Sequence, residues 1–405
     1  MVELLTLSNG LKVLLKEEKG FEILAGTLFM PGGSSLDPVE GITLLTLRTA
    51  FKRSLRRDAE QFYSLQEQMG TPFSPEVSVD YSQLRFQSVS RFSADYLMLL
   101  KETVLNPGFV EESFQVEKSS LLASIRAKRE NAFTLAYEAM MKLTYKGTPY
   151  SKMPYGTEES VLSLTLERCR DWFSEAFVPE GSIVSLCGDL KGVDSFLKEL
   201  EELPLKPQNS EKFNLRISET KTEFIHRKGS AQSFILVALN APSVSEEEYP
   251  VYKLLNTAIG EGIGSLLFQE LREKRGFAYS TGSLYPSRRN TGRILLYIGT
   301  SPEKEERVRE ELRRLLSRLP ELITPEVVER SRRYFRGTYL LDHETRGKKA
   351  WYLGFWEVLG RGYSYDGKFL EEIENVPLKN ILETAEKLSV EPFHEVVVRD
   401  EEGNC

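Results

Sequence analysis

The sequence predicts an α+β protein with two related domains, each a mostly antiparallel sheet packed by helices. Its length of 405 residues is sufficient for two domains with substantial cores. The order of strand-like and helix-like segments in the first half recurs in the second, which indicates an internal duplication with about 200 residues per copy. We therefore expect an N-terminal domain over residues 1–203, a polar, proline-bearing linker over 204–218 and a C-terminal domain over 219–405.

Periodicity and turn residues predict the elements of the first half. Residues 11–16 and 23–30 have strand composition, and we expect them to pair as a hairpin. A helix ending at Gly70 is expected because glycine commonly stops a helix. The elements predicted after the hairpin are helices at 39–57 and 59–69, a strand at 81–90, helices at 93–105, within 111–145 and at 160–176, and a strand at 182–187.

The second half follows the same plan. A second strand pair is expected, and the chain again ends in a strand after a helix, a glycine turn and an acidic stretch. The corresponding tail segments are 137–162 in the first half and 351–373 in the second. The predicted elements are strands at 223–227, 233–239, 293–298 and 395–399, helices at 249–259 and 265–275, and a further helix after residue 298.

Composition and charge exclude several classes of protein. With 40% hydrophobic and 28% charged residues the chain is globular, and its net charge of −7 provides no basic field for nucleic acid. Cys169, Cys187 and Cys405 are odd in number and far apart, so they indicate neither a disulfide framework nor a Cys-x-x-Cys metal site. There is no long uncharged apolar run and no secretory signal pattern, and we expect a cytoplasmic protein without a membrane segment.

The segment 271–279, Leu-Arg-Glu-Lys-Arg-Gly-Phe-Ala-Tyr, places two hydrogen-bond donors near each other. Arg272 is expected in the last turn of a helix that stops at Gly276, and Tyr279 at the start of the next strand. A guanidinium and a phenol on rigid elements could hold a peptide carbonyl, or stabilise the oxyanion that forms when water attacks it. The alternative is structural: the arginine complements a helix C-terminus beside a packed tyrosine.

The helix that begins Gly41-Ile-Thr-Leu-Leu-Thr-Leu-Arg resembles the zinc-binding helix of the pitrilysin and mitochondrial-processing-peptidase family. In that family the helix carries a Gly-x-x-His-x-x-Glu-His pattern. The resemblance covers nearly the whole chain and implies the family's metallohydrolase fold of two related domains. In family members the second domain carries an Arg and a Tyr seven positions apart in a Leu-Arg-Glu-Lys-Arg-Gly-Leu-Ala-Tyr-like segment. Residues 271–279 match that segment, with Phe277 as the one departure.

The resemblance also implies two zinc-binding histidines on this helix and a glutamate that takes a proton from the metal-bound water, and this sequence lacks all three. Leu44, Leu47 and Arg48 occupy the places of the His, Glu and His. Leucine has no lone pair to donate, and arginine repels a divalent cation. The family's third ligand is a glutamate on a later helix, where Ala123 and Ser124 stand in this chain. We therefore expect no metal in this chain.

Other catalytic or cofactor sites find little support in the sequence. The three histidines, His226, His343 and His394, are far apart, and we interpret His343 as a satisfied surface or helix-cap residue. No Gly-x-Ser-x-Gly elbow indicates a serine hydrolase.

A glycine-rich stretch precedes the helix that carries Arg272. Its glycines are Gly260, Gly262 and Gly264, and it lacks the preceding strand and the lysine of a phosphate-binding loop. In the resembling family a glycine-rich loop stands at this place, and in some subunits it touches substrate. A tight turn between helices that needs positive φ is an equal alternative.

Two hypotheses about function follow from the resemblance. In the first, the chain is the zinc-less, substrate-binding subunit of a heterodimeric metalloendopeptidase, inactive alone. Arg272 and Tyr279 then hold the peptide, while a partner chain with an intact His-x-x-Glu-His motif supplies zinc. In the second, the chain is a catalytically inactive structural or peptide-binding protein of the same fold. A homodimeric peptidase with its own zinc is disfavoured by the missing ligands.

Overall fold

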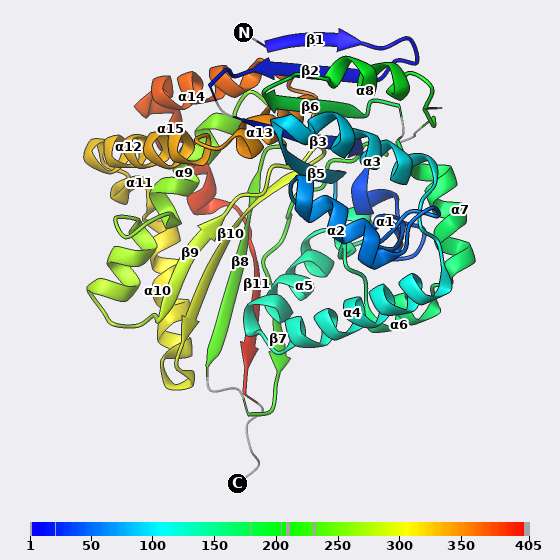
Figure 1. The fold of residues 1–405 in the computed structure, drawn as a ribbon. Coiled ribbons are helices and arrows are strands. Elements are labelled where there is room, and N and C mark those ends of the chain that lie inside the picture. The colour runs from blue at the N-terminus through cyan, green and yellow to red at the C-terminus, as the bar shows by residue number, and fades with distance from the viewer. Residues whose placement is uncertain are drawn as a thin grey trace. The chain divides into compact units, whose positions relative to one another are not determined.

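A computed structural model describes residues 2–20, 22–178, 180–203, 205–207, 211–229 and 232–400. The chain forms two compact units, each built around its own sheet (Figure 1). The first unit comprises Met1–Ala127, Lys152–Glu211 and Asp342–Asp366, and the second comprises Lys128–Ser151, Lys212–Leu341 and Gly367–Cys405.

The first unit has a six-stranded sheet in the order β1-β2-β6-β3-β5-β4. Its central strands β3 and β6 are almost entirely buried, as expected for strands covered on both faces. The strands are β1 Val2–Thr6, β2 Lys12–Glu17, β3 Ile23–Pro31, β4 Ser74–Val77, β5 Tyr81–Val89 and β6 Ile183–Gly188.

The second unit has a five-stranded sheet in the order β7-β11-β8-β10-β9. Strand β9 is short and lies at one end of this sheet, so one of its backbone edges has no strand partner among the described residues. The strands are β7 Lys221–His226, β8 Ser233–Ala241, β9 Ser280–Leu284, β10 Gly292–Thr300 and β11 His394–Arg399.

The two sheets share one pairing scheme, which confirms the predicted fold class of two similar α+β layers. In each sheet one pair is parallel, β2 with β6 and β7 with β11, and the other pairs are antiparallel. The predicted hairpins are wrong in both halves. The last strand of each half, β6 or β11, inserts between the two strands expected to pair, because these buried apolar strands take the central position that local sequence cannot reveal.

The helices of the first unit largely follow the sequence prediction. Helix α1 begins later than expected, because Gly41 adopts a left-handed conformation with φ of 87° immediately before it, and it also ends earlier than expected, at Ala50. Strands β1 and β4 and helix α8 were not expected. The helices are α1 Ile42–Ala50, α2 Ala59–Met69, α3 Ser93–Leu105, α4 Glu111–Arg129, α6 Glu158–Ser163, α7 Leu166–Ala176, α8 Val193–Leu200 and α13 Arg346–Val358.

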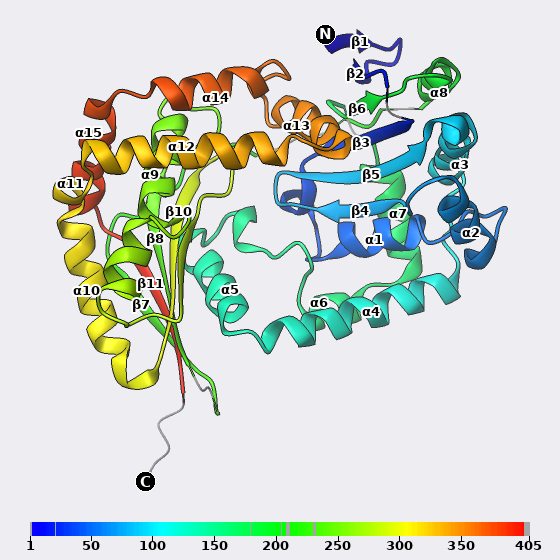
Figure 2. The same cartoon turned by 60° about the vertical axis from the view of Figure 1, so that its left-hand side comes forward.

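The helices of the second unit lie on both faces of its sheet. Figure 2 shows α5 on one face and α9 and α10 on the other. The helices are α5 Ala132–Thr144, α9 Tyr249–Gly260, the π-helix η4 Phe268–Glu273, α10 Glu305–Ser317, α11 Leu319–Leu322, α12 Pro325–Asp342, α14 Tyr365–Asn375 and α15 Leu378–Val390. Short 3₁₀ turns occur at Gly33–Leu36, Ser90–Phe92, Pro149–Ser151 and Pro302–Lys304.

The units do not coincide with the two halves of the sequence. Helix α5, from the first half, packs on β8 and β11 of the second unit, and α13, from the second half, packs on β3 and β6 of the first. Gly354 on α13 allows close packing, because a Cβ there would lie 2.4 Å from the ring of Phe29. The division at residues 211 and 212 falls inside the expected linker, of which residues 204 and 208–210 lie outside the described residues. The boundaries of independently folding domains stay a prediction.

Two smaller expectations concern cysteines and membrane segments. Cys169 and Cys187 are buried free thiols, and burial raises the pKa of Cys187 to about 11. Cys405 lies outside the described residues.

In the part of the chain that the structure describes, no helix combines the length and apolar character needed to span a bilayer.

Candidate functional site

The first candidate region is helix α1, where the resembling family binds zinc. Leu44 and Leu47 are 9% and 3% exposed and belong to the hydrophobic core of the first unit. Arg48 is half-buried and makes no hydrogen bond or ion pair with any described residue. These three positions therefore hold two leucines packed in the core and one arginine without an ion pair among the described residues. Such a set of side chains is unsuitable for binding Zn²⁺.

Helix α4 carries the expected place of the third ligand. Ala123 is exposed and Ser124 is half-buried, and neither provides a carboxylate. Instead, Glu117 on this helix pairs with Lys52, with 2.9 Å between Nζ and Oε1. Burial lowers the pKa of Lys52, but the hydrogen bond and charge of Glu117 outweigh it and leave the pKa raised. This ion pair thus joins the turn that follows α1 to helix α4.

Elsewhere in the part of the chain that the structure describes, the residues do not fit a zinc ion either. Among the described residues, no group of three or more His, Cys, Asp and Glu side chains could hold a metal. His343 stacks on Tyr352 at 3.9 Å between ring centroids and lies 3.0 Å from an oxygen of Asp366, as expected for a satisfied histidine. His394 lies in β11, and burial, with Arg293 and Lys221 adding to it, lowers its pKa to about 4.

The second candidate region is the segment that carries Arg272 and Tyr279. Over Phe268–Glu273 the expected α-helix is a π-helix. This geometry is rare in proteins, and where it occurs it is often at a functional site. The helix ends at Glu273, two residues earlier than expected, and Gly276 follows with a φ of 59° and an amide that donates to the carbonyl of Arg272. The strand begins at Ser280, later than expected, and the Tyr279 amide donates to the carbonyl of Gly299 at 2.9 Å.

Arg272 differs from its cationic neighbours in having no carboxylate partner. Lys274 and Arg275 both pair with Glu270, at 2.5 and 2.9 Å, and Arg275 also pairs with Glu311 at 2.8 Å. Arg272 is exposed, and no described residue forms a hydrogen bond or ion pair with its guanidinium. Its contact is with the ring of Phe268, 5.1 Å from the guanidinium carbon, which restricts the side chain without using its N–H donors.

Tyr279 is also exposed and available. Its side chain is 59% exposed, and within the described ranges no residue hydrogen-bonds its hydroxyl. The structure records no hydrogen bond between Tyr279 and Arg272. The structural alternative required a packed tyrosine and an arginine engaged with the helix end, so the exposure of both groups favours a ligand for these donors.

The glycine-rich stretch is explained by close packing within the second unit. A Cβ at Gly260 would lie 2.4 Å from Oγ of Ser283, and one at Gly262 would lie 2.7 Å from the ring of Tyr334. A Cβ at Gly264 would lie 2.8 Å from Nε of Arg330. Gly262 also has a φ of 77°, as the tight-turn alternative requires. Contact of these glycines with substrate stays a prediction.

Gly262→Ala is expected to lower the free energy of unfolding by more than Gly276→Ala. Both glycines have positive φ, so alanine costs about 1–2 kcal/mol of backbone strain at either place. A Cβ at Gly276 meets nothing within 4 Å, whereas one at Gly262 overlaps the Tyr334 ring. Denaturant unfolding should therefore show a larger loss of unfolding free energy for Gly262→Ala than for Gly276→Ala. In a Tyr334→Ala background, the loss caused by Gly262→Ala should be smaller. Equal losses in the two single variants would contradict the packing explanation.

Asp37, which the sequence did not single out, fixes the start of α1. Its carboxylate accepts hydrogen bonds from the Gly41 amide and the Thr43 hydroxyl, and Trp172 donates to that hydroxyl at 2.8 Å. The carboxyl is buried, and burial raises its pKa to about 7 despite these hydrogen bonds. The sequence offered one signal for this role, an aspartate that precedes Pro38 and a helix start. Because aspartate is common in turns, this signal did not single out Asp37.

The raised pKa of Asp37 predicts a pH dependence of stability. A carboxyl with a folded pKa of about 7 and an ordinary value of 3.8 contributes stability that is fully present below pH 3.8 and lost as pH rises through 7. The full loss is roughly 4 kcal/mol, at about 1.36 kcal/mol per pKa unit. We expect the melting temperature of the wild type, relative to Asp37→Asn, to fall between pH 4 and 7. A constant difference over that range would contradict the assignment.

Two family models match consecutive parts of the chain. The model of the insulinase family, peptidase family M16, matches residues 12–158, and the model of the peptidase M16 inactive domain matches residues 163–335. An uncharacterized zinc protease of Rickettsia felis is 25% identical over 392 residues, covering 94% of this chain and 93% of that protein. The non-peptidase homolog YmxG of Helicobacter pylori is 23% identical over 364 residues, covering 87% and 83%.

A solved structure shares the fold at low sequence identity. The peptidase M16 inactive domain from Pseudomonas fluorescens superposes with a TM-score of 0.91 at 21% identity, covering 99% of this chain and 98% of that one. The likeness therefore extends over the residues of both units.

Proposed function

Because this chain belongs to peptidase family M16, we propose that it is the zinc-less, substrate-holding subunit of a two-chain metallopeptidase. The observation that carries the proposal is the state of Arg272 and Tyr279. Both are exposed, and neither side chain has a polar partner among the described residues. At the same time, the three positions of the family's zinc motif on α1 hold two core leucines and an arginine.

In the proposed role, Arg272 and Tyr279 bind a peptide carbonyl. The guanidinium is always cationic and offers several N–H donors, and the phenol offers one O–H donor. Donors fixed in position before the reaction stabilise negative charge as it develops on the carbonyl oxygen. The partner, an M16 chain with an intact His-x-x-Glu-His motif, provides the zinc. The proposal includes no catalytic step by this chain's own α1, because Leu44, Leu47 and Arg48 offer no donor atoms for a metal.

A second candidate function has one specific observation in its favour. The Helicobacter pylori relative is named a non-peptidase homolog. A structural or peptide-binding protein without any zinc partner would retain the same fold, since fold alone does not determine activity. The two candidates differ in whether an active pair forms.

Reconstitution with a zinc-bearing chain separates the two candidates. This chain is mixed with an M16 chain from the same genome that has an intact His-x-x-Glu-His helix, and complex formation is followed by size-exclusion chromatography. The proposal expects a complex that cleaves a quenched fluorescent peptide faster than either chain alone. If no such chain forms a complex or gains activity on mixing, the structural or peptide-binding function is supported instead.

A further inference from the structure

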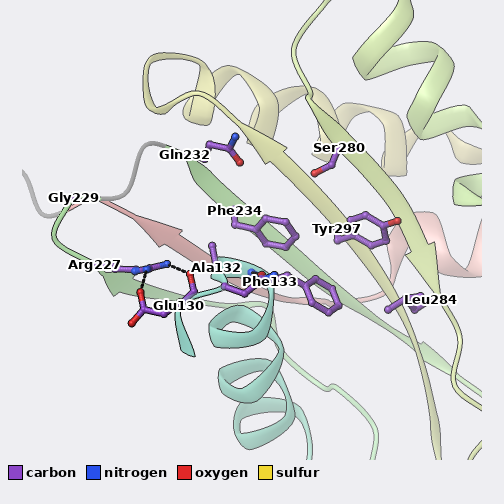
Figure 3. A pocket seen from close by; sticks show the side chains of 11 residues that line it. Glu130, Ala132, Phe133, Arg227, Gly229, Gln232, Phe234, Ser280, Leu284 and Tyr297 are labelled. Carbon is purple, nitrogen blue, oxygen red and sulfur yellow. Dashed lines mark hydrogen bonds and ion pairs between the residues drawn. The ribbon is translucent and has the colours of Figure 1, made fainter. Parts of the chain in front are cut away.

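A hollow of about 870 Å³ opens along strand β9 in the second unit. It begins at Ser280, the residue directly after Tyr279, and continues along β9 to Leu284. Figure 3 shows the side chains around it, which come from the start of α5, the β7–β8 connection and strands β8, β9 and β10. The hollow and Tyr279 thus adjoin the same strand, β9, so a peptide paired along that strand would pass both.

Three aromatic rings form the apolar part of the hollow. The ring of Phe133 meets those of Phe234 and Tyr297 edge-on, with centroids 5.6 and 5.8 Å apart. The rings of Phe234 and Tyr297 are nearly parallel, with an interplanar angle of 8°. Aromatic side chains prefer these edge-to-face and offset arrangements, so a further ring can extend the cluster.

The charge at the rim is already neutralised. Arg227 donates to the Glu130 carboxylate at 2.9 Å and to the Glu130 backbone carbonyl at 2.6 Å. A carboxylate on a ligand would have to compete with Glu130 for this arginine. The hollow therefore favours an uncharged aromatic group over an acidic one.

The neighbouring strand supplies a way to present such a group. Strand β9 ends its sheet, and its residues Ser280 and Leu284 line the hollow from the same face. Between them, Gly282 lies opposite Tyr297, and a Cβ there would be 2.4 Å from the tyrosine hydroxyl. Glycine thus leaves room for the Tyr297 ring over the strand. A peptide paired with the free edge of β9 would direct alternate side chains over the hollow.

We propose that this hollow is a specificity pocket for an aromatic side chain of the peptide held at Arg272 and Tyr279. The inference rests on the proposed substrate-holding function and adds the substrate's side-chain class. Strand geometry of about 3.3 Å per residue places the aromatic residue roughly two to four positions from the carbonyl at Tyr279. Phe133, Phe234 and Tyr297 form the pocket, and Ser280 and Leu284 form its open side.

Peptide binding to the purified full chain tests the pocket. The probes are fluorescent, end-blocked nine-residue peptides of Ala, Ser and Lys in which a single Phe, Leu, Ala or Glu is moved along the sequence. Fluorescence anisotropy should show one position where Phe binds about ten- to a hundred-fold more tightly than Ala, the range for burying one large apolar side chain. Glu at that position should bind no better than Ala.

Variants that fill the hollow test whether it is the source of the preference for Phe over Ala. Ser280→Trp and Leu284→Trp, at exposed positions, fill the hollow and should reduce the ratio of Phe to Ala affinity to about one. Glu223→Trp, on the exposed edge strand β7 and away from the hollow, is the matched control and should keep the ratio. Arg272→Ala should weaken all peptides equally.

Each outcome has a distinct meaning. If Phe and Ala peptides bind equally at every position, or if the preference persists in both tryptophan variants at 280 and 284, the pocket assignment is wrong while peptide holding stands. If no peptide binds at all, the proposed function fails and the pocket assignment fails with it.

Discussion

Arg272→Ala is expected to lower the turnover of the reconstituted two-chain peptidase by about a hundred- to a thousand-fold. This is the scale for losing one donor that stabilises the developing oxyanion. The loss should appear mainly in kcat, because the interaction strengthens in the transition state. Tyr279→Phe, which removes only the hydroxyl, should have a loss of the same order. Both are measured with a quenched fluorescent peptide at saturating partner.

Lys274→Ala is the matched control for Arg272→Ala. Lys274 lies two residues away in the same segment, but its ammonium is paired with Glu270 at 2.5 Å. Removing it deletes an exposed cation that has a partner, so turnover should change less than about three-fold. Equal losses in Arg272→Ala and Lys274→Ala would mean that general charge, and not the unpaired guanidinium, matters. Unchanged turnover in Arg272→Ala and Tyr279→Phe would remove both residues from the mechanism.

Leu47→Glu is expected to lower the free energy of unfolding by more than about 4 kcal/mol. Leu47 is 3% exposed within the core of the first unit, and the substitution both removes packed methyl groups and buries a carboxylate. Although glutamate restores the residue that the family has at this position, the surrounding core cannot hydrate it. Thermal unfolding followed by circular dichroism measures the effect.

Ala123→Glu is the control for Leu47→Glu, since it also introduces a glutamate at a position where the family carries one. Ala123 is exposed on α4, so the change in unfolding free energy should stay within about 0.5 kcal/mol. Added zinc should stabilise neither variant. A Leu47→Glu variant that keeps the wild-type melting temperature, or that zinc stabilises, would show that α1 can still open as a ligand helix.

The fold was predictable where the determinants are local. Glycine at 70 and 276 marks helix ends, and alternation over 81–90 marks β5, because backbone conformation and side-chain period act over a few residues. Strand pairing was not predictable in the same way. The insertion of β6 between β2 and β3 depends on a strand more than 150 residues away, and only the assembled sheet selects it.

The packing of the units was also beyond local sequence. Helix α13 covers β3 and β6, although it lies in the second half of the chain. One local trace of that contact is Gly354, whose missing Cβ makes room for Phe29. A glycine in a helix has several explanations, so it could not identify its partner before the structure was known.

The candidate site was predictable in part, because one short segment carries both Arg272 and Tyr279. Their availability was not, since it depends on the carboxylates of Glu270 and Glu311 binding Lys274 and Arg275 instead. The aromatic pocket could not be predicted either. Its rings lie at positions 133, 234 and 297, and one helix and two strands bring them together.

Peptide hydrolysis by the separated and combined chains tests most directly whether this chain is the zinc-less half of a peptidase. The purified chain, a zinc-bearing M16 partner and their mixture are assayed on one quenched fluorescent peptide, with and without a chelator, and the zinc content of each is measured. The expected result is cleavage by the mixture that the chelator abolishes, with no zinc and no cleavage in this chain alone. Stoichiometric zinc and chelator-sensitive cleavage in this chain alone would contradict it.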